Sequence, residues 1–259
     1  MNMSLVLLGS LLPPLLLTCL IYRMDKVEKE PKGLIVKLVL FGAFSAVLAV
    51  VLESLIGKCI IMVIPTESGA YSLVYYFVGI ALMEELAKFL FLKKLTWKHP
   101  AFDYTFDGVV YAVAISLGFA ALENIMYVAG IGVWVAAIRA VTSIPGHCIY
   151  AIYMGISYGM AKKAEAQGRK GAKWGNLFKA LLVPTLIHGF YDYAASGGNK
   201  VWVIIFLVFI TVLYVLAIRR VRRGEREDSR IYDAPTDGEC ASIEGCSAPE
   251  ESLPNPFEK

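Results

Sequence analysis

Long apolar runs, separated by short polar segments, extend over most of the 259-residue chain. Seven runs have the length of about 20 residues that a helix needs to cross a hydrocarbon core of about 30 Å. The lysine-free stretch 106–161 is too long for one crossing, and we expect it to turn back at residues 130–132 (Gly-Ile-Gly). Residues 54–64 are apolar apart from Lys58, so they either extend the second run or lie at the membrane interface. The pattern predicts an all-α, polytopic membrane bundle of about seven transmembrane helices, at 4–22, 34–52, 71–92, 108–129, 133–160, 176–194 and 201–218.

The composition agrees with a membrane protein. Hydrophobic residues make up 57% of the chain and charged residues 18%, with a mean hydropathy of +0.60. Soluble domains are about 45–50% apolar and about 25% charged. The five cysteines follow neither a disulfide framework nor a zinc-finger spacing. A water-soluble enzyme, a nucleic-acid-binding protein and a secreted disulfide scaffold are therefore excluded.

Positive charges are divided unevenly between the two sets of loops. One set holds seventeen Lys and Arg residues, whereas the alternate set holds two, Lys58 and Lys200. Because cytoplasmic loops carry the excess of Lys and Arg, we expect the N-terminus outside and the C-terminus inside. The first run has its charges after it and no cleavage site, so we expect a span rather than a signal peptide. The positive loops are 23–37, 93–98, 162–173 and 219–223.

The end of the chain differs from the rest in charge. Residues 224–259 contain ten Asp and Glu against three Lys and Arg, together with four prolines. Such a segment buries too little apolar surface to fold by itself. We therefore expect residues 224–259 to form an acidic, disordered cytoplasmic tail that follows a transmembrane domain at 1–223.

Ionisable and polar side chains lie inside four of the predicted spans. A charge at the centre of a spanning helix costs about 2.5–3.5 kcal/mol on insertion scales, so such residues face a bundle interior or water and usually mark function. We expect them to line one hydrated cavity. They are Glu84, Glu85 and Lys88 in the third span, Glu123 and Asn124 in the fourth with Asp107 at its start, Arg139 and His147 in the fifth, and His188 and Asp192 in the sixth.

Spacing along the helices predicts local pairs. Glu84 and Lys88 are four residues apart and share a helix face, whereas Glu85 points about 100° away and needs another partner. His188 and Asp192 are also four apart, so the carboxylate can accept an imidazole N–H and fix its tautomer. Counted from the helix ends, the group lies on average in the outer half of the bilayer.

These residue types suit hydrolysis inside a membrane. Peptide cleavage needs a base that activates water and donors for the developing oxyanion, and glutamates, histidines and an asparagine supply both. A zinc ion could instead activate the water, with Glu123, His147 and His188 as candidate ligands. The HExxH zinc signature and the usual serine and aspartyl motifs are absent from the sequence. Zinc and a metal-free mechanism both stay open.

Five motifs in order carry a resemblance to a known family. They are residues 83–88 (MEELAK), 106–111 (FDGVVY), 118–124 (GFAALEN), 145–147 (PGH, after Arg139) and 188–192 (HGFYD). Together they resemble the PrsW family of bacterial intramembrane proteases. That family is distantly similar to the CAAX prenyl endopeptidase and bacteriocin-immunity superfamily, in which a histidine stands where this chain has Glu123.

The resemblance implies a multi-pass enzyme of the bacterial cell membrane, with a protease domain at 1–223. It implies cleavage of a membrane-anchored anti-sigma factor on the extracytoplasmic side, which starts regulated intramembrane proteolysis in a stress response. By matched position, Glu84 would be the base and Glu85 its support, while His147 and His188 would hold water, a metal or the oxyanion. Asp192 would orient His188, Glu123 would be a second acid or a ligand, and Asn124 an oxyanion donor.

Other interpretations of the same residues remain. Lys88, Arg139 and Asp107 have supporting roles, and we expect the last two to be structural, in ion pairs or as helix caps. An ion-coupled transporter or proton relay also collects buried Glu and His residues. A non-catalytic immunity-type protein could keep the motifs. As partners we expect a membrane-anchored protein substrate and membrane lipid, and no nucleic acid.

Overall fold

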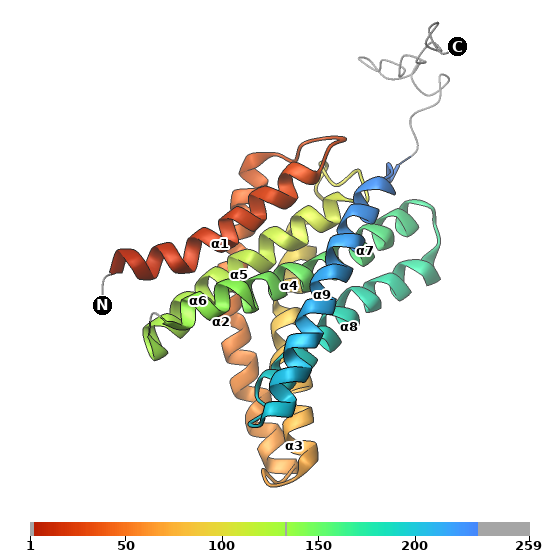
Figure 1. Ribbon diagram of the computed structural model, residues 1–259. Helices are drawn as coiled ribbons and strands as arrows, with labels where there is room; N and C mark the ends of the chain where they lie inside the picture. Colours follow the sequence, from red (N-terminus) through yellow and green to blue (C-terminus); the bar gives the residue numbers. More distant parts are fainter. Residues whose placement is uncertain (1–2, 133, 233–259) are drawn as a thin grey trace, which may run out of the picture.

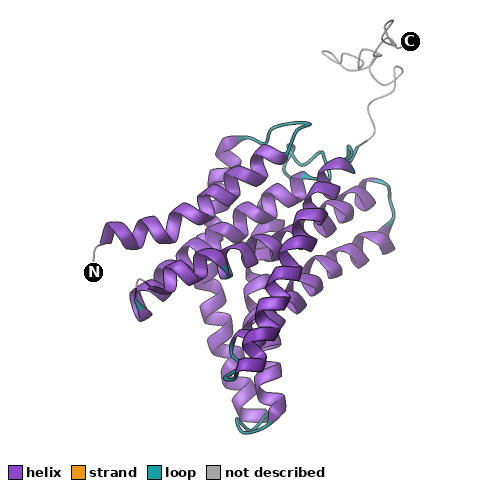
Figure 2. Ribbon diagram, in the orientation of Figure 1, coloured by secondary structure: helices purple, strands orange, loops and turns teal. Residues whose placement is uncertain are grey.

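The computed structural model describes residues 3–132 and 134–232, and within them the chain is helical (Figures 1 and 2). The predicted all-α class is confirmed for the described residues. Each of the seven predicted runs coincides with described helical segments, apart from residue 133, which lies outside the described residues, and the non-helical Thr142. The predicted disorder of the tail concerns mainly residues 233–259, which lie outside the described residues. The segments are α1 Met3–Met24, α2 Lys32–Val63, α3 Gly69–Val74, the π-helix η1 Tyr75–Ala81, α4 Leu82–Thr96, α5 Asp107–Ile131, α6 Trp134–Val141, α7 Ser143–Ala166, α8 Lys170–Ala195 and α9 Lys200–Arg226.

Within the described residues, four helical stretches are long and apolar enough to cross a membrane: α2, α5, α6 with α7, and α9. Residues 54–64 prove to be largely an extension of the second helix, which ends at Val63. The predicted turn at 130–132 is also present, because α5 ends at Ile131 and Gly132 adopts a φ of 120°. Two predicted spans are interrupted. The span at 71–92 contains the π-helix η1, and the span at 133–160 breaks at Thr142 between α6 and α7.

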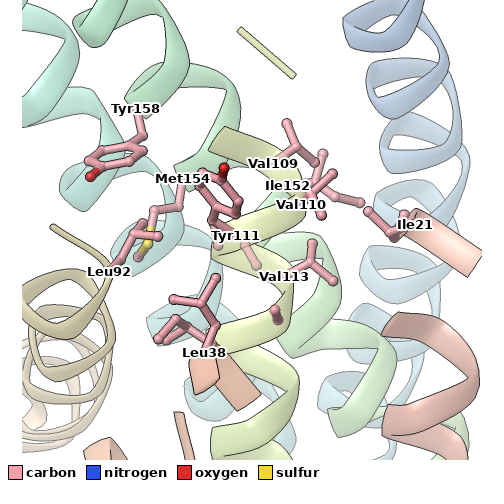
Figure 3. Close-up of a cluster of buried hydrophobic side chains, with 14 of the residues drawn as sticks. Ile21, Leu38, Leu92, Val109, Val110, Tyr111, Val113, Ile152, Met154 and Tyr158 are labelled. Atoms are coloured by element: carbon pink, nitrogen blue, oxygen red, sulfur yellow. The ribbon is translucent and has the colours of Figure 1, made fainter. Parts of the chain in front are cut away.

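Helix α5 is the centre of the bundle and α9 lies at its outside (Figure 1). Of the most apolar window of each helix, 72% is buried in α5 and 11% in α9. Because α9 is hydrophobic yet unburied, its side chains are suited to contact lipid. Helix α5 packs against α2, α7, α1 and α4, and Figure 3 shows Leu38, Tyr111, Met154 and Tyr158 in this core.

Glycines allow the central helices to approach closely. A Cβ atom at Gly42 of α2 would overlap the carbonyl oxygen of Ile115 in α5, and one at Gly118 of α5 would overlap that of Val39 in α2. Small residues at such crossings bring helix backbones together in membrane proteins. The contact fixes α5, which carries Glu123, against the helix that runs beside α4.

Candidate active site

Two local irregularities place the polar residues of the site. The π-helix η1 ends at Ala81, three residues before Glu84, and π-type turns are frequent at functional sites. On the facing helix α8, a Cβ atom at Gly189 would lie 2.6 Å from the Phe77 ring of η1. The absence of a side chain at Gly189 therefore lets α8 come close enough to bring His188 to the glutamate pair.

The break between α6 and α7 positions His147. Thr142 leaves helical geometry with a φ of −121° and a ψ of −71°, and α7 begins one residue later. Pro145 is the third residue of α7, where its missing N–H costs nothing because the first turn has no intrahelical acceptor. His147 then follows within the second turn of α7, and its carbonyl accepts a hydrogen bond from Ser116 Oγ of α5 at 2.9 Å.

Lys88 is fully buried between three acceptors. Its Nζ lies 3.1 Å from Glu84 Oε2, 2.8 Å from Glu85 Oε1 and 3.1 Å from His147 Nδ1. The predicted Glu84–Lys88 pair is thus confirmed, and Lys88 also pairs with Glu85. Buried charges are tolerated when they are paired and hydrogen-bonded. Lys88 therefore joins the two glutamates of α4 to the histidine of α7.

His188 lies between the carboxylates of two helices. Its Nδ1 is 3.0 Å from Glu85 Oε1, and its Nε2 is 3.3 Å from Asp192 Oδ2 and 3.9 Å from Glu84 Oε2. Glu85 thereby has the second partner that its direction on the helix required. A ring held by a carboxylate at each nitrogen has a fixed orientation.

Glu123 forms the third side of the site. Its Oε2 lies 2.8 Å from His147 Nε2 and 2.7 Å from Arg139 Nη2. Arg139 Nε donates to Asn124 Oδ1 at 3.0 Å, and its guanidinium lies 4.1 Å from the centre of the Tyr127 ring. Arg139 is thus in an ion pair, as expected, and it connects α6 to α5.

A cavity of about 120 Å³ opens between these helices. At about 30 Å³ per water molecule it has room for roughly four waters. Of the residues selected from sequence, six line it and four do not. The lining residues are Glu84, Glu123, Arg139, His147, His188 and Asp192, together with Tyr76, Ile80, Tyr127, Ser143, Tyr150 and Tyr191.

The residues outside the lining have different surroundings. Glu85 and Lys88 lie behind the wall of the cavity and hold its residues in place. Asn124 is fully buried and bonded to Arg139, so its side chain is not presented to the cavity. Asp107 is not brought to this site at all. It begins α5, sixteen residues before Glu123, and at 1.5 Å per residue that is about 24 Å away along the helix.

Tyr150 belongs to the site but was not selected from the sequence. Its ring stacks on His188 with a centroid distance of 4.6 Å, and its hydroxyl is buried without a hydrogen-bond partner among the described residues. A buried hydroxyl without a partner is unusual and costs free energy. Tyr150 is three residues after His147, on the same face of α7, which is the sequence signal that could have identified it.

Three side chains of the site are of the types that bind metal ions. Ligand atoms of Glu84, Glu85 and His147 all lie within 4.8 Å of one another, and carboxylates and imidazole are zinc ligands. Glu85 Oε2 is buried and has no hydrogen-bond partner among the described residues. The ammonium group of Lys88 is bonded to the same three side chains. A metal held by all three would therefore take the place of this ammonium group.

Comparison with known proteins gives one consistent result. Residues 30–218 match the family model described as "PrsW family intramembrane metalloprotease". Protease PrsW of Oceanobacillus iheyensis is 33% identical over 85% of this chain and 95% of its own length. Protease PrsW of Bacillus subtilis is 28% identical over 85% of this chain and 95% of its own length. No solved structure matches the chain. The matched region contains all five motifs and the whole cavity, and the chain therefore belongs to the PrsW family of intramembrane metalloproteases and is a protease.

Proposed function

We propose that this protease cleaves a single-span, membrane-anchored anti-sigma factor on the extracytoplasmic side and so starts regulated intramembrane proteolysis. The observation that carries the proposal is the convergence of Glu84, Glu123, His147 and His188, from four helices, on one small polar cavity. Such groups are costly inside a membrane, and a shared site for water is the arrangement that hydrolysis needs.

Glu84 is the general base in this proposal. It lines the cavity, whereas Glu85 lies behind it and is held by Lys88 and His188. Glu84 can take a proton from a water in the cavity, and the nearby Lys88 ammonium balances the charge of its carboxylate. Glu85 and Asp192 act as positioning residues, because each contacts a different nitrogen of His188.

The oxyanion that forms on the scissile carbonyl needs hydrogen-bond donors. His188 lines the cavity and can donate there, and the Tyr150 hydroxyl is a second donor that has no other partner among the described residues. Asn124, an earlier candidate for this role, is engaged by Arg139. Donors aimed at developing charge in a site with little water contribute strongly to the rate.

A bound metal would be the alternative to this metal-free arrangement. Zinc is the metal that the donor set favours, and Glu84, Glu85 and His147 would hold it in place of the Lys88 ammonium group, so that Glu84 would be a ligand rather than the base. A bound zinc ion supplies a Lewis acid that lowers the pKa of an attached water. Glu123 lies 2.8 Å from the other nitrogen of His147 and would then fix the orientation of that ring, as carboxylates do beside metal-binding histidines. Glu123 and His188, which the sequence suggested as ligands, are positioning groups in this arrangement.

The position of the site along its helices agrees with the outer half of the membrane. We propose seven crossings of the bacterial plasma membrane with the N-terminus outside, a transmembrane protease domain at 1–223 and a cytoplasmic tail at 224–259. Asp192 is three residues from the end of α8 at Ala195, and Glu123 is eight residues from the end of α5 at Ile131. These residues are then within about 5–12 Å of the outer ends of their helices.

The test compares cells that express wild-type protein, Glu84→Gln and the control Glu67→Gln, whose side chain lies in an exposed loop. Quantitative proteomics of the membrane fraction should show one single-span protein truncated with wild type and Glu67→Gln. The same protein should stay at full length with Glu84→Gln. Equal cleavage by Glu84→Gln would overturn the mechanism, and substrate-dependent proton flux in liposomes would support a transporter instead. Zinc measured in the purified proteins tests the metal separately.

A further inference from the structure

A second cluster of buried carboxylates lies at the opposite end of α5 from the cavity. Asp25 and Glu30 belong to the loop between α1 and α2, and Asp107 is the first residue of α5. The three side chains are 1–4% exposed, and their ligand atoms lie within 4.8 Å of one another. Asp107 and Glu123 are about 24 Å apart along α5, so this cluster is separate from the protease site.

No lysine or arginine among the described residues forms an ion pair with these three carboxylates. Lys29 is the nearby cation, but its ammonium group donates to main-chain carbonyl oxygens at the end of α1, those of Tyr22, Arg23 and Asp25. Asp228, another acidic residue, lies at this end of the bundle and accepts from the N–H of Phe106 at 2.8 Å. The surroundings therefore add negative charge and supply no ion pair to these three carboxylates.

Hydrogen bonds hold two of the three carboxylates in place. Asp107 Oδ2 accepts from the main-chain N–H groups of Asp103 and Tyr104 at 3.1 and 2.7 Å. Glu30 accepts a hydrogen bond from the Tyr111 hydroxyl. Asp25 is different, because its Oδ2 is buried and has no hydrogen-bond partner among the described residues. Asp25 therefore keeps a buried oxygen without a hydrogen-bond partner in a cluster whose other two carboxylates are held in place.

Burial makes this charge unfavourable near neutral pH. Desolvation raises the pKa of Asp25 to about 6, against a smaller opposing effect of Lys29. Desolvation also raises the pKa of Glu30 to about 7, against the hydrogen bond from Tyr111. Like-charged carboxylates in one site are stabilised either by a proton between them or by a cation.

The distances between the carboxylate oxygens of the cluster favour a bound cation over a shared proton at Asp25. A proton can be shared where two carboxyl oxygens lie within about 3 Å of each other, and Glu30 and Asp107 form such a hydrogen-bonded pair. Asp25 Oδ2 has no hydrogen-bond partner among the described residues, so that pair does not satisfy it. Oxygens bound to one Ca²⁺ at about 2.3–2.6 Å can be up to about 5 Å apart, and those bound to Mg²⁺ up to about 4.2 Å. The 4.8 Å limit on the cluster lies in this range. An oxygen-only donor set selects hard cations over zinc.

We propose that Asp25, Glu30 and Asp107 bind a hard divalent cation, Mg²⁺ or Ca²⁺, at a structural site distinct from the protease centre. The cation joins the loop between α1 and α2 to the first turn of α5. The segment after α9 reaches the same place, where Ile231 N–H donates to the carbonyl oxygen of Asp103 at 2.7 Å. A bound ion thus braces the end of the bundle where three parts of the chain meet.

The experiment uses full-length protein in detergent, stripped with EDTA, and measures thermal unfolding while CaCl₂ or MgCl₂ is added. The midpoint should rise by roughly 5–10 °C once the cation is at about a hundred times its dissociation constant. Asp25→Asn should abolish the rise, and Glu30→Gln provides a second variant if the first does not fold. Terbium luminescence excited through Tyr111 should report binding in wild type and be lost in the same variants.

Two control variants distinguish this site from the rest of the molecule. Glu67→Gln changes an exposed carboxylate, and Glu84→Gln changes the protease cavity, so both should keep the full cation-dependent shift. Loss of the shift in Glu84→Gln would assign the cation to the cavity and overturn the proposal. So would a wild-type protein that neither Ca²⁺ nor Mg²⁺ stabilises, because the cluster would then hold protons alone. Failure of the proposed proteolysis would leave this result unchanged.

Discussion

Lys88 balances the charge of the two neighbouring glutamates of α4. It is the buried cation that Glu84 and Glu85 share, and its side chain is fully inaccessible. Removing one partner of a buried ion pair typically costs about 3–5 kcal/mol, because the other charge is left unpaired. Variants that remove Lys88 would therefore confuse folding with catalysis. Amide substitutions of the glutamates keep the size of the side chain and are the sharper test.

Tyr150→Phe isolates one proposed interaction. The hydroxyl has no partner among the described residues, so its removal should leave the unfolding midpoint unchanged or slightly raised. The aromatic ring would still stack on His188. If the hydroxyl donates to the oxyanion, the cleavage rate should fall about 10²–10³-fold, the typical effect of removing one such donor. A rate assay with purified enzyme and its identified substrate, alongside thermal unfolding, measures both quantities.

The matched control is Tyr153→Phe, which removes a hydroxyl from the same helix outside the cavity lining. Its cleavage rate should equal that of wild type. A Tyr150→Phe enzyme that cleaves at the wild-type rate would remove Tyr150 from the mechanism. In that case His188 remains as the donor.

At the residue scale, the sequence predicts which residue types form the site better than it predicts which side chains contact each other. The spacing of Glu84 and Lys88, and of His188 and Asp192, was enough to predict contacts within one helix. Contacts between helices depend on rotation and depth, which one sequence does not determine. For that reason the Glu123–His147 contact could not be specified in advance. The position of Asp107 at the start of a predicted span suggests that it belongs to the site, yet in the structure it lies at the other end of α5.

At the element scale, the sequence predicts which segments are helical but not where a helix is interrupted. The apolar runs predict where the helices lie, because a membrane-spanning helix forms all its backbone hydrogen bonds internally and exposes apolar side chains to lipid. The π-helix η1 and the break at Thr142 leave no clear mark in hydrophobicity. Both lie within one or two turns of a cavity residue, so these two irregularities affect where the polar side chains of the cavity are placed.

The crossing of α2 and α5 should be intolerant of any side chain at Gly42. In Gly42→Ala the added methyl group would overlap the Ile115 carbonyl, so the helices must separate. Overpacking of this kind typically costs about 1–3 kcal/mol. Gly33→Ala in the same helix has no atom within 4 Å of the new Cβ and should be neutral or slightly stabilising. Thermal unfolding in detergent compares the two, and equal midpoints would contradict the close crossing.

At the scale of the whole molecule, two groups of buried charge lie at opposite ends of α5. The protease cavity lies toward the end at Ile131, and the carboxylate cluster surrounds its beginning at Asp107. Residues 23–37, which include the loop between α1 and α2 at the Asp107 end, contain five Lys and Arg residues, and the positive-inside rule favours the cytoplasm for such a segment. In the proposed orientation, with the N-terminus outside, the cavity faces the exterior and the carboxylate cluster faces the cytosol. The orientation of the chain in the membrane therefore decides on which side cleavage occurs.

Labelling of introduced cysteines tests this direction. Gly198→Cys lies in the exposed loop between α8 and α9, and Gln167→Cys lies in the exposed loop between α7 and α8. With the C-terminus inside, a membrane-impermeant maleimide should label Gly198→Cys in intact cells and Gln167→Cys only after the membrane is opened. The background replaces every native cysteine with serine: Cys19, Cys59, Cys148, Cys240 and Cys246.

The reverse labelling pattern would place the cavity in the cytoplasmic half and contradict extracytoplasmic cleavage. Labelling of both sites in intact cells would mean that α8 does not cross the membrane. Helix α8 is the decisive element, because it carries His188 and Asp192 but is not among the four stretches that qualify as spans by length and apolarity. Its Lys170, Lys173 and Lys179 lie in the first half, where they can reach anionic lipid of the inner leaflet. The second half of α8 carries His188 and Asp192 to the cavity. The expected labelling therefore requires that contacts with the other helices offset the cost of placing these polar side chains inside the membrane.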